Sequence, residues 1–104
     1  MPDPSAQLQS LVDAGFELQI FERYPKAVGA VRDGCIALLE VTPEGVRPVG
    51  QAGWRMGEVM GLLVERNGRQ VFQYKSEVLE ATPERLAALR RFREELEALL
   101  AAGS

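Results

Sequence analysis

The sequence contains no histidine and only one cysteine. Histidine is the commonest general base and the usual metal ligand, so its absence excludes Ser-His-Asp and Cys-His catalytic systems and the familiar zinc sites. The acidic residues form no calcium-loop pattern, and the glycines form neither a dinucleotide fingerprint nor a Walker motif. We therefore expect no catalytic residues, no metal and no cofactor. An enzyme that uses carboxylates, lysine or tyrosine remains an alternative.

Basic blocks and long hydrophobic runs are also missing. The net charge is −3, from 12 basic and 15 acidic residues, and the only basic cluster, at 90–93, is followed directly by two glutamates. Nucleic-acid binding needs a basic surface that displaces counterions, so we expect no nucleic-acid partner. The longest apolar runs, such as 36–39, are far shorter than a membrane span, so we expect no membrane association.

Cys35 has no second cysteine with which to form an internal disulfide. Residues 1–15 lack the basic start and apolar centre of a signal peptide, which makes the cytoplasm the default location. A reactive thiolate needs a nearby cation, and the sequence places only Arg32 close by. We interpret Cys35 as a small buried hydrophobic residue.

A chain of 104 residues with 46% hydrophobic and 26% charged residues has the size and composition of a single globular domain, 1–104. A short helix is predicted over 4–14, with Asp3 or Ser5 as its cap and Gly15 as its stop. A longer helix is predicted over 83–101, because Thr82 can cap it, a proline and an acid follow, and Gly103 lies just past its end.

Between the two helices, the sequence alternates like strands and carries three turn signals, at 33–34, 43–45 and 67–68. The predicted strands are 16–23, 27–32, 35–42, 46–51, 58–66 and 69–80. The expected fold is α+β: a short N-terminal helix, an antiparallel meander of five or six strands able to curl into a half-barrel, and a long C-terminal helix packed on the sheet.

The Asn67-Gly68 turn fixes the register of the last predicted hairpin. It places Gly61 opposite Tyr74, whose ring would cover the bare backbone. The same register places Arg66 opposite Arg69, a like-charge pair that is tolerable at an exposed loop end.

The C-terminal helix carries an apolar stripe at spacings of three and four residues. This stripe packs either on the sheet of its own chain or on a second copy. The candidate interface residues on it are Leu89, Phe92, Leu96 and Leu99.

The segment Gly50–Gly61 holds four of the ten glycines and the only tryptophan. One interpretation is a bend or bulge at the sheet edge, with Trp54 folded over the core. The other is a ligand-binding loop, because tryptophan offers a flat face and arginine a fork for carboxylate or phosphate. The candidate ligand-binding residues are Trp54, Arg55, Glu58 and Lys75.

Two functional hypotheses follow from these features. The first is a small non-catalytic interaction or regulatory module that pairs with a second copy or with another protein, through the helix stripe or an unpaired sheet edge. The alternative is a small-molecule or anion-binding protein, with weak enzymatic activity as a variant, that uses the Gly50–Gly61 loop.

Overall fold

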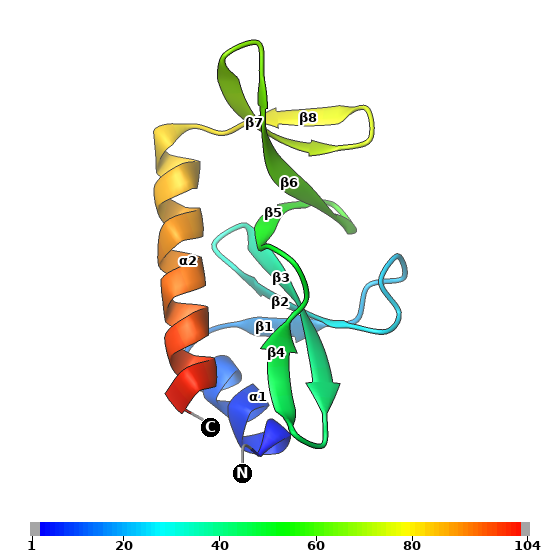
Figure 1. Ribbon diagram of the computed structural model, residues 1–104, viewed down its shortest axis with the longest axis vertical. Helices are drawn as coiled ribbons and strands as arrows, with labels where there is room; N and C mark the ends of the chain where they lie inside the picture. Colours follow the sequence, from blue (N-terminus) through cyan, green and yellow to red (C-terminus); the bar gives the residue numbers. More distant parts are fainter. Residues whose placement is uncertain (1–2, 103–104) are drawn as a thin grey trace.

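The computed structural model describes residues 3–102 and confirms the predicted α+β architecture (Figure 1). A short N-terminal helix precedes an antiparallel sheet curled into a half-barrel, and a long C-terminal helix follows it. The elements in chain order are α1 (Pro4–Asp13), β1 (Glu17–Gln19), β2 (Val28–Arg32), β3 (Cys35–Thr42), β4 (Gly45–Pro48), β5 (Gly53–Met56), β6 (Val59–Arg66), β7 (Arg69–Tyr74), β8 (Glu77–Glu80) and α2 (Pro83–Ala102).

The predicted caps start both helices. The Asp3 carboxylate accepts a hydrogen bond from the Ser5 backbone N–H at 3.0 Å, and the Thr82 hydroxyl accepts one from the Arg85 N–H at 3.2 Å. Each cap satisfies an N–H group that has no partner inside the helix. Gly15 follows α1 with a φ of 93°, as predicted, whereas Gly103 lies outside the described residues.

The sheet has eight strands rather than five or six, because two predicted segments differ. The expected strand 69–80 is divided at Lys75, whose φ of 54° turns the chain into a hairpin between β7 and β8. Residues 53–56, expected in a loop, form β5, which pairs with β6 through a two-residue turn at Gly57 and Glu58. A φ of 68° at Gly57 gives the left-handed first position that such a turn requires.

The strand order is β1-β2-β3-β5-β6-β7-β8, with β4 paired to β3 outside this path. Thus β4 and β5 share one edge of β3. Val49 donates its N–H to the Leu38 carbonyl at 2.8 Å, and Gly53 pairs with Ile36. Residues 50–52 therefore lie opposite Ala37 alone and bulge out of the ladder.

The strand β6 changes partners along its length. Residues 59–61 pair with β5, and residues 62–66 pair with β7. Beyond Gly61 the strands β6, β7 and β8 consequently form a three-stranded ribbon, which projects from the end of the molecule opposite α1 (Figure 1). We call these three strands the ribbon.

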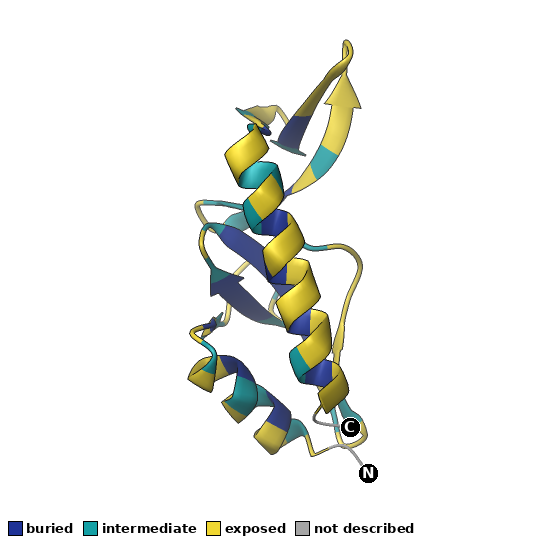
Figure 2. Cartoon of the chain, turned by 90° about the vertical axis from the view of Figure 1, so that its left-hand side faces the viewer, coloured by how far each residue is buried: buried dark blue, intermediate teal, exposed yellow. Residues whose placement is uncertain are grey.

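The main core lies between the sheet and the two helices. The α2 stripe faces the sheet and its other side is exposed (Figure 2), and Phe92 packs on Phe16 with ring centroids 5.3 Å apart. A smaller cluster on the opposite face of the sheet contains Phe21, Val31, Ile36 and Leu38. The predicted strand 16–23 ends at Gln19, and the chain then turns so that Phe21 covers this second cluster.

The predicted cover of Gly61 by Tyr74 is wrong. The Met56 side chain occupies the space where a Cβ on Gly61 would project, since Gly61 pairs with Trp54 of β5. The predicted register of the last hairpin is otherwise confirmed, and Arg66 lies opposite Arg69. Both Asn67 and Gly68 have positive φ, as the tight hairpin turn requires.

Candidate functional site

Trp54 and Arg55 point to opposite faces of the sheet, because successive strand residues alternate. The Trp54 ring stacks on Phe72 of the main core, with centroids 5.4 Å apart and planes 30° apart. It also lies against Gly34, where a Cβ would come within 2.5 Å of the indole. Trp54 thus packs on the core, as the bend interpretation predicted.

Arg55 has partners on the face away from α2. Its guanidinium carbon lies 5.2 Å from the centre of the Phe21 ring, and its Nε donates to the Gly57 carbonyl at 3.0 Å. A terminal guanidinium nitrogen of Arg55 lies 3.9 Å from a carboxylate oxygen of Glu58 across the same turn. The guanidinium is therefore engaged by its own hairpin.

Lys75 lies in the β7–β8 turn, with its ammonium 5.6 Å from the centre of the Tyr74 ring. Within the described chain it makes no ion pair or hydrogen bond with Trp54, Arg55 or Glu58. The four predicted ligand-binding residues thus do not converge on one site in this structure.

The Gly50–Ala52 bulge encloses little space. A cavity of about 100 Å³ lies between the bulge and α2, lined in part by Arg93 and Glu97. Ligand sites usually enclose about 300–1,000 Å³. This cavity accommodates a few water molecules rather than a metabolite.

The predicted interface stripe of α2 is used within the chain. Leu89, Phe92 and Leu96 are 4%, 1% and 3% exposed and belong to the main core, and Leu99 packs against that core while half-buried. A second copy could reach these side chains only after the helix left its own sheet. Any dimer of the folded chain must use another surface.

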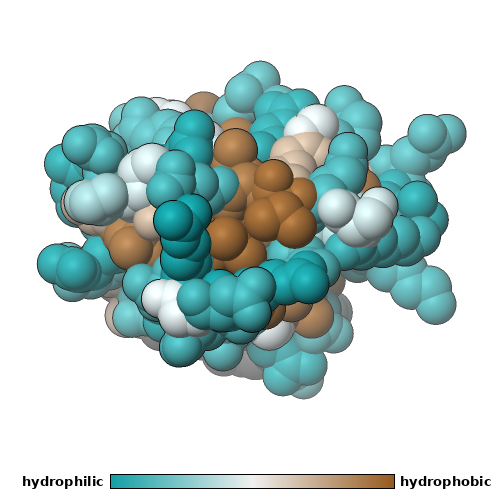
Figure 3. All heavy atoms as spheres, turned by 90° about the horizontal axis from the view of Figure 1, so that it is seen from above, coloured by the Kyte–Doolittle hydropathy of each residue, from teal (hydrophilic) through white to brown (hydrophobic). Residues whose placement is uncertain are grey.

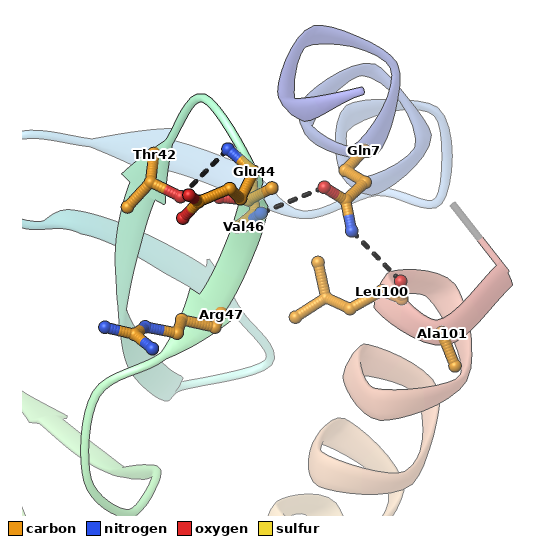
Figure 4. Close-up of a pocket in the computed structure, with 8 residues that line it drawn as sticks. Gln7, Thr42, Glu44, Val46, Arg47, Leu100 and Ala101 are labelled. Carbon is orange, nitrogen blue, oxygen red and sulfur yellow. Dashed lines mark hydrogen bonds between the residues drawn. The ribbon is translucent and has the colours of Figure 1, made fainter. Parts of the chain in front are cut away.

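A pocket of about 320 Å³ lies where α1, β4 and the end of α2 meet (Figure 4). At its wall, the buried Gln7 amide accepts a hydrogen bond from the Val46 N–H at 2.9 Å and donates one to the Leu100 carbonyl at 3.0 Å. Thr42 and Glu44 form the β3–β4 turn at its rim. Both ends of the Gln7 amide are thus used within the fold, which gives this side chain a structural role.

A shallow apolar groove of about 540 Å³ lies between the 20–27 loop and the sheet. Its lining includes Tyr24, Pro25, Leu38 and Val49. The Tyr24 hydroxyl already accepts the Met60 N–H at 3.2 Å, and Glu40 at the rim is bound by Arg47 at 2.8 Å. The Tyr24 and Glu40 side chains are thus engaged within the chain, and the ammonium group of Lys26 is the remaining charged group in the lining.

Residues 3–102 contain neither an activated cysteine nor a cluster of metal-binding side chains. Burial, reinforced by the nearby Asp33, raises the pKa of the Cys35 thiol to about 11, so the thiolate is scarce at neutral pH. No three side chains of the metal-binding types gather closely within this range. Across the same range, neither helix combines the length and hydropathy needed to cross a bilayer.

The ribbon is apolar on both faces, and sequence reasoning missed this feature. One face packs on the main core through Leu63, Phe72 and Leu79. The other, which we call the ribbon face, points away from α2. Its residues, from the strand register, are Leu62, Val64 and Arg66 on β6, Arg69, Val71 and Gln73 on β7, and Val78 and Glu80 on β8.

The ribbon face leaves large apolar side chains in solvent. Leu62, Val64 and Val78 are 43%, 38% and 49% exposed. Figure 3 looks onto this end of the molecule and shows an uncovered apolar area framed by hydrophilic residues. The signal in the sequence is the run 59–64, in which every residue except Gly61 is apolar, a pattern typical of a strand covered on both faces.

The charges on the ribbon face are unpaired within the described chain. Arg66 and Arg69 lie directly opposite each other across the hairpin, both exposed. A directly opposed like-charge pair lowers the stability of a sheet. Neither arginine forms an ion pair with any residue between 3 and 102, and the same holds for the Glu80 carboxylate.

Comparison with known proteins identifies no relative: no family model matches the sequence, and no curated protein or solved structure is significantly similar.

Proposed function

We propose that this protein is a non-catalytic interaction module that binds another protein chain through the ribbon face. One observation carries the proposal: beyond Gly61, β6 is apolar on both faces, and the chain covers only the face of Leu63. Apolar surface gathered on one exposed face is typical of protein interaction sites. The partner of the module is a second copy of the chain or a different protein.

Site-specific photocrosslinking tests this proposal. A photoreactive residue in place of Leu62 should form an adduct with the partner in cells, and mass spectrometry of the adduct identifies the chain that is joined. The same residue in place of Val12, which is 49% exposed on α1, is the matched control. Equal labelling from both positions, or none from either, would contradict an interaction through the ribbon face.

We further propose that the protein acts in the cytoplasm, where its lone cysteine stays reduced. Fractionation of cells tests this location, and recovery outside the cytoplasm would refute it.

A further inference from the structure

We infer that the partner on the ribbon face is a second copy of this chain, packed ribbon face to ribbon face about a twofold axis parallel to β7. This inference rests on the proposed function and names its partner. A twofold interface places the same surface of both copies in contact, so the surface must be complementary to itself. The ribbon face meets this requirement in both its apolar and its charged residues.

The apolar residues match across such an axis. A half-turn about this axis places β7 of one copy over β7 of the other. It also places β6 of each copy over β8 of the other. Leu62 and Val78 occupy the same row of the ladder, since both flank Gln73. Leu62 of each copy thus lies over Val78 of the other. Packed sheets lie about 10 Å apart with strands within about 30° of alignment, which accommodates this arrangement.

The charged residues match as well. Glu80 lies in the row of Val64 and Val71, and the Arg66–Arg69 pair lies one pleat further along. One pleat is about 7 Å, within the reach of an arginine side chain. The rotation therefore places Glu80 of each copy over Val64 of the other, one pleat from the arginine pair and within its reach. A shared carboxylate offsets the repulsion that this pair suffers in the single chain.

The other in-plane axis gives no such match. An axis perpendicular to the strands, drawn through the middle row of Val64, Val71 and Glu80, would place Glu80 of each copy over Glu80 of the other, because such an axis leaves each strand over its own counterpart. Two acidic groups would then face each other. Charge complementarity thus selects the axis parallel to β7.

The interface is small. Three strands cover about 10 Å in width, and the three rows cover about 13 Å in length. This is much less than a standard interface, so we expect a weak dimer that is dissociated at low micromolar concentration. The ribbon lies at the end of the molecule opposite α1 (Figure 1), which keeps α1 away from the interface.

A complementation experiment with two charge variants tests the inference. The first variant is Arg66→Glu with Arg69→Glu, and the second is Glu80→Arg. Each alone brings like charges together at both symmetric contacts and should dimerise at least tenfold more weakly than the wild type in sedimentation velocity. Mixed together, they form a heterodimer in which both contacts pair opposite charges. The mixture should recover near wild-type affinity.

Glu77→Arg is the matched control, because Glu77 is exposed on the same strand but on the other face of the ribbon. It should dimerise normally. When it is mixed with the Arg66→Glu, Arg69→Glu variant, it should not restore dimerisation. Circular dichroism melting verifies that every variant is folded. Unchanged dimerisation of the charge variants, or a mixture without rescue, would overturn the inference.

A wild-type chain that stays monomeric at about 1 mM would overturn it too. If the Leu62 crosslink then joins a different protein, the interaction module stands and only the second copy is refuted. If no adduct forms either, both proposals fail.

Discussion

Gly53 and Gly61 approach each other so closely across the β5–β6 ladder that a Cβ on Gly53 would collide with the Gly61 carbonyl oxygen. Gly57 supplies the positive φ of the turn between them. These glycines thus serve backbone geometry, which was one of the two interpretations of the segment Gly50–Gly61. The contact of Met56 with Gly61 was not predictable, because it depends on a strand that the sequence did not reveal.

The Cys35 thiol makes stability depend on alkaline pH. Burial raises its pKa from 9.0 to about 11. Below pH 9 the thiol is protonated in both the folded and the unfolded chain, so its contribution to the free energy of unfolding is intact. As pH rises from 9 to 11, the unfolded chain ionises while the folded chain does not, so stability falls, by at most about 2–3 kcal/mol. Urea unfolding across this pH range measures the decline.

Cys35→Ala is the control for this titration. The alanine variant should be less stable at every pH, because a buried side chain has been shortened. Its stability should nevertheless lack the part of the alkaline decline that the thiol contributes. Equal alkaline slopes for the two proteins would show that the thiol does not ionise as burial requires.

Among the elements, α1 connects β4 to the end of α2 through side-chain hydrogen bonds. The Gln7 amide contacts the Val46 N–H and the Leu100 carbonyl, as Figure 4 shows. It thereby covers an outward N–H on the free edge of β4, where Pro48 offers none. Edge strands are commonly protected in these two ways.

Gln7→Ala should lower the free energy of unfolding by about 1–3 kcal/mol, because the Val46 N–H would remain buried without an acceptor. Chemical denaturation measures the loss. Gln9→Ala is the control, since Gln9 is exposed on the same helix and bonds only to Asp13, and its effect should stay within about 0.5 kcal/mol. Similar losses for both variants would show that the Gln7 hydrogen bonds do not stabilise the fold.

The molecule as a whole is long and thin, with extents of 45 × 26 × 18 Å. The helix α2 spans much of this length, and the ribbon lies at one end with a single face covered (Figures 1 and 2). The apolar residues therefore fall into two groups, those that hold the monomer together and those that stay exposed on the ribbon face.

Substitutions in the two groups should differ sharply at low micromolar concentration, where a weak dimer is dissociated. Phe92→Ala should cost about 3–5 kcal/mol of unfolding free energy, because it empties the centre of the core. Leu62→Gln should change it by no more than about 0.5 kcal/mol. Urea titrations compare the two. A large loss for Leu62→Gln would assign the ribbon face to the core instead.

The sequence by itself determined the two helices, the main hairpins and the α+β class, because caps, turns and periodicity act between residues near in the chain. It also predicted the opposed arginines, since the Asn67-Gly68 turn sets the register. Only the tertiary structure decided that the α2 stripe packs on its own sheet, that Trp54 and Arg55 face apart, and that one side of the ribbon stays uncovered. Those outcomes depend on how a curled sheet meets a helix far away in sequence, and no local pattern encodes that geometry.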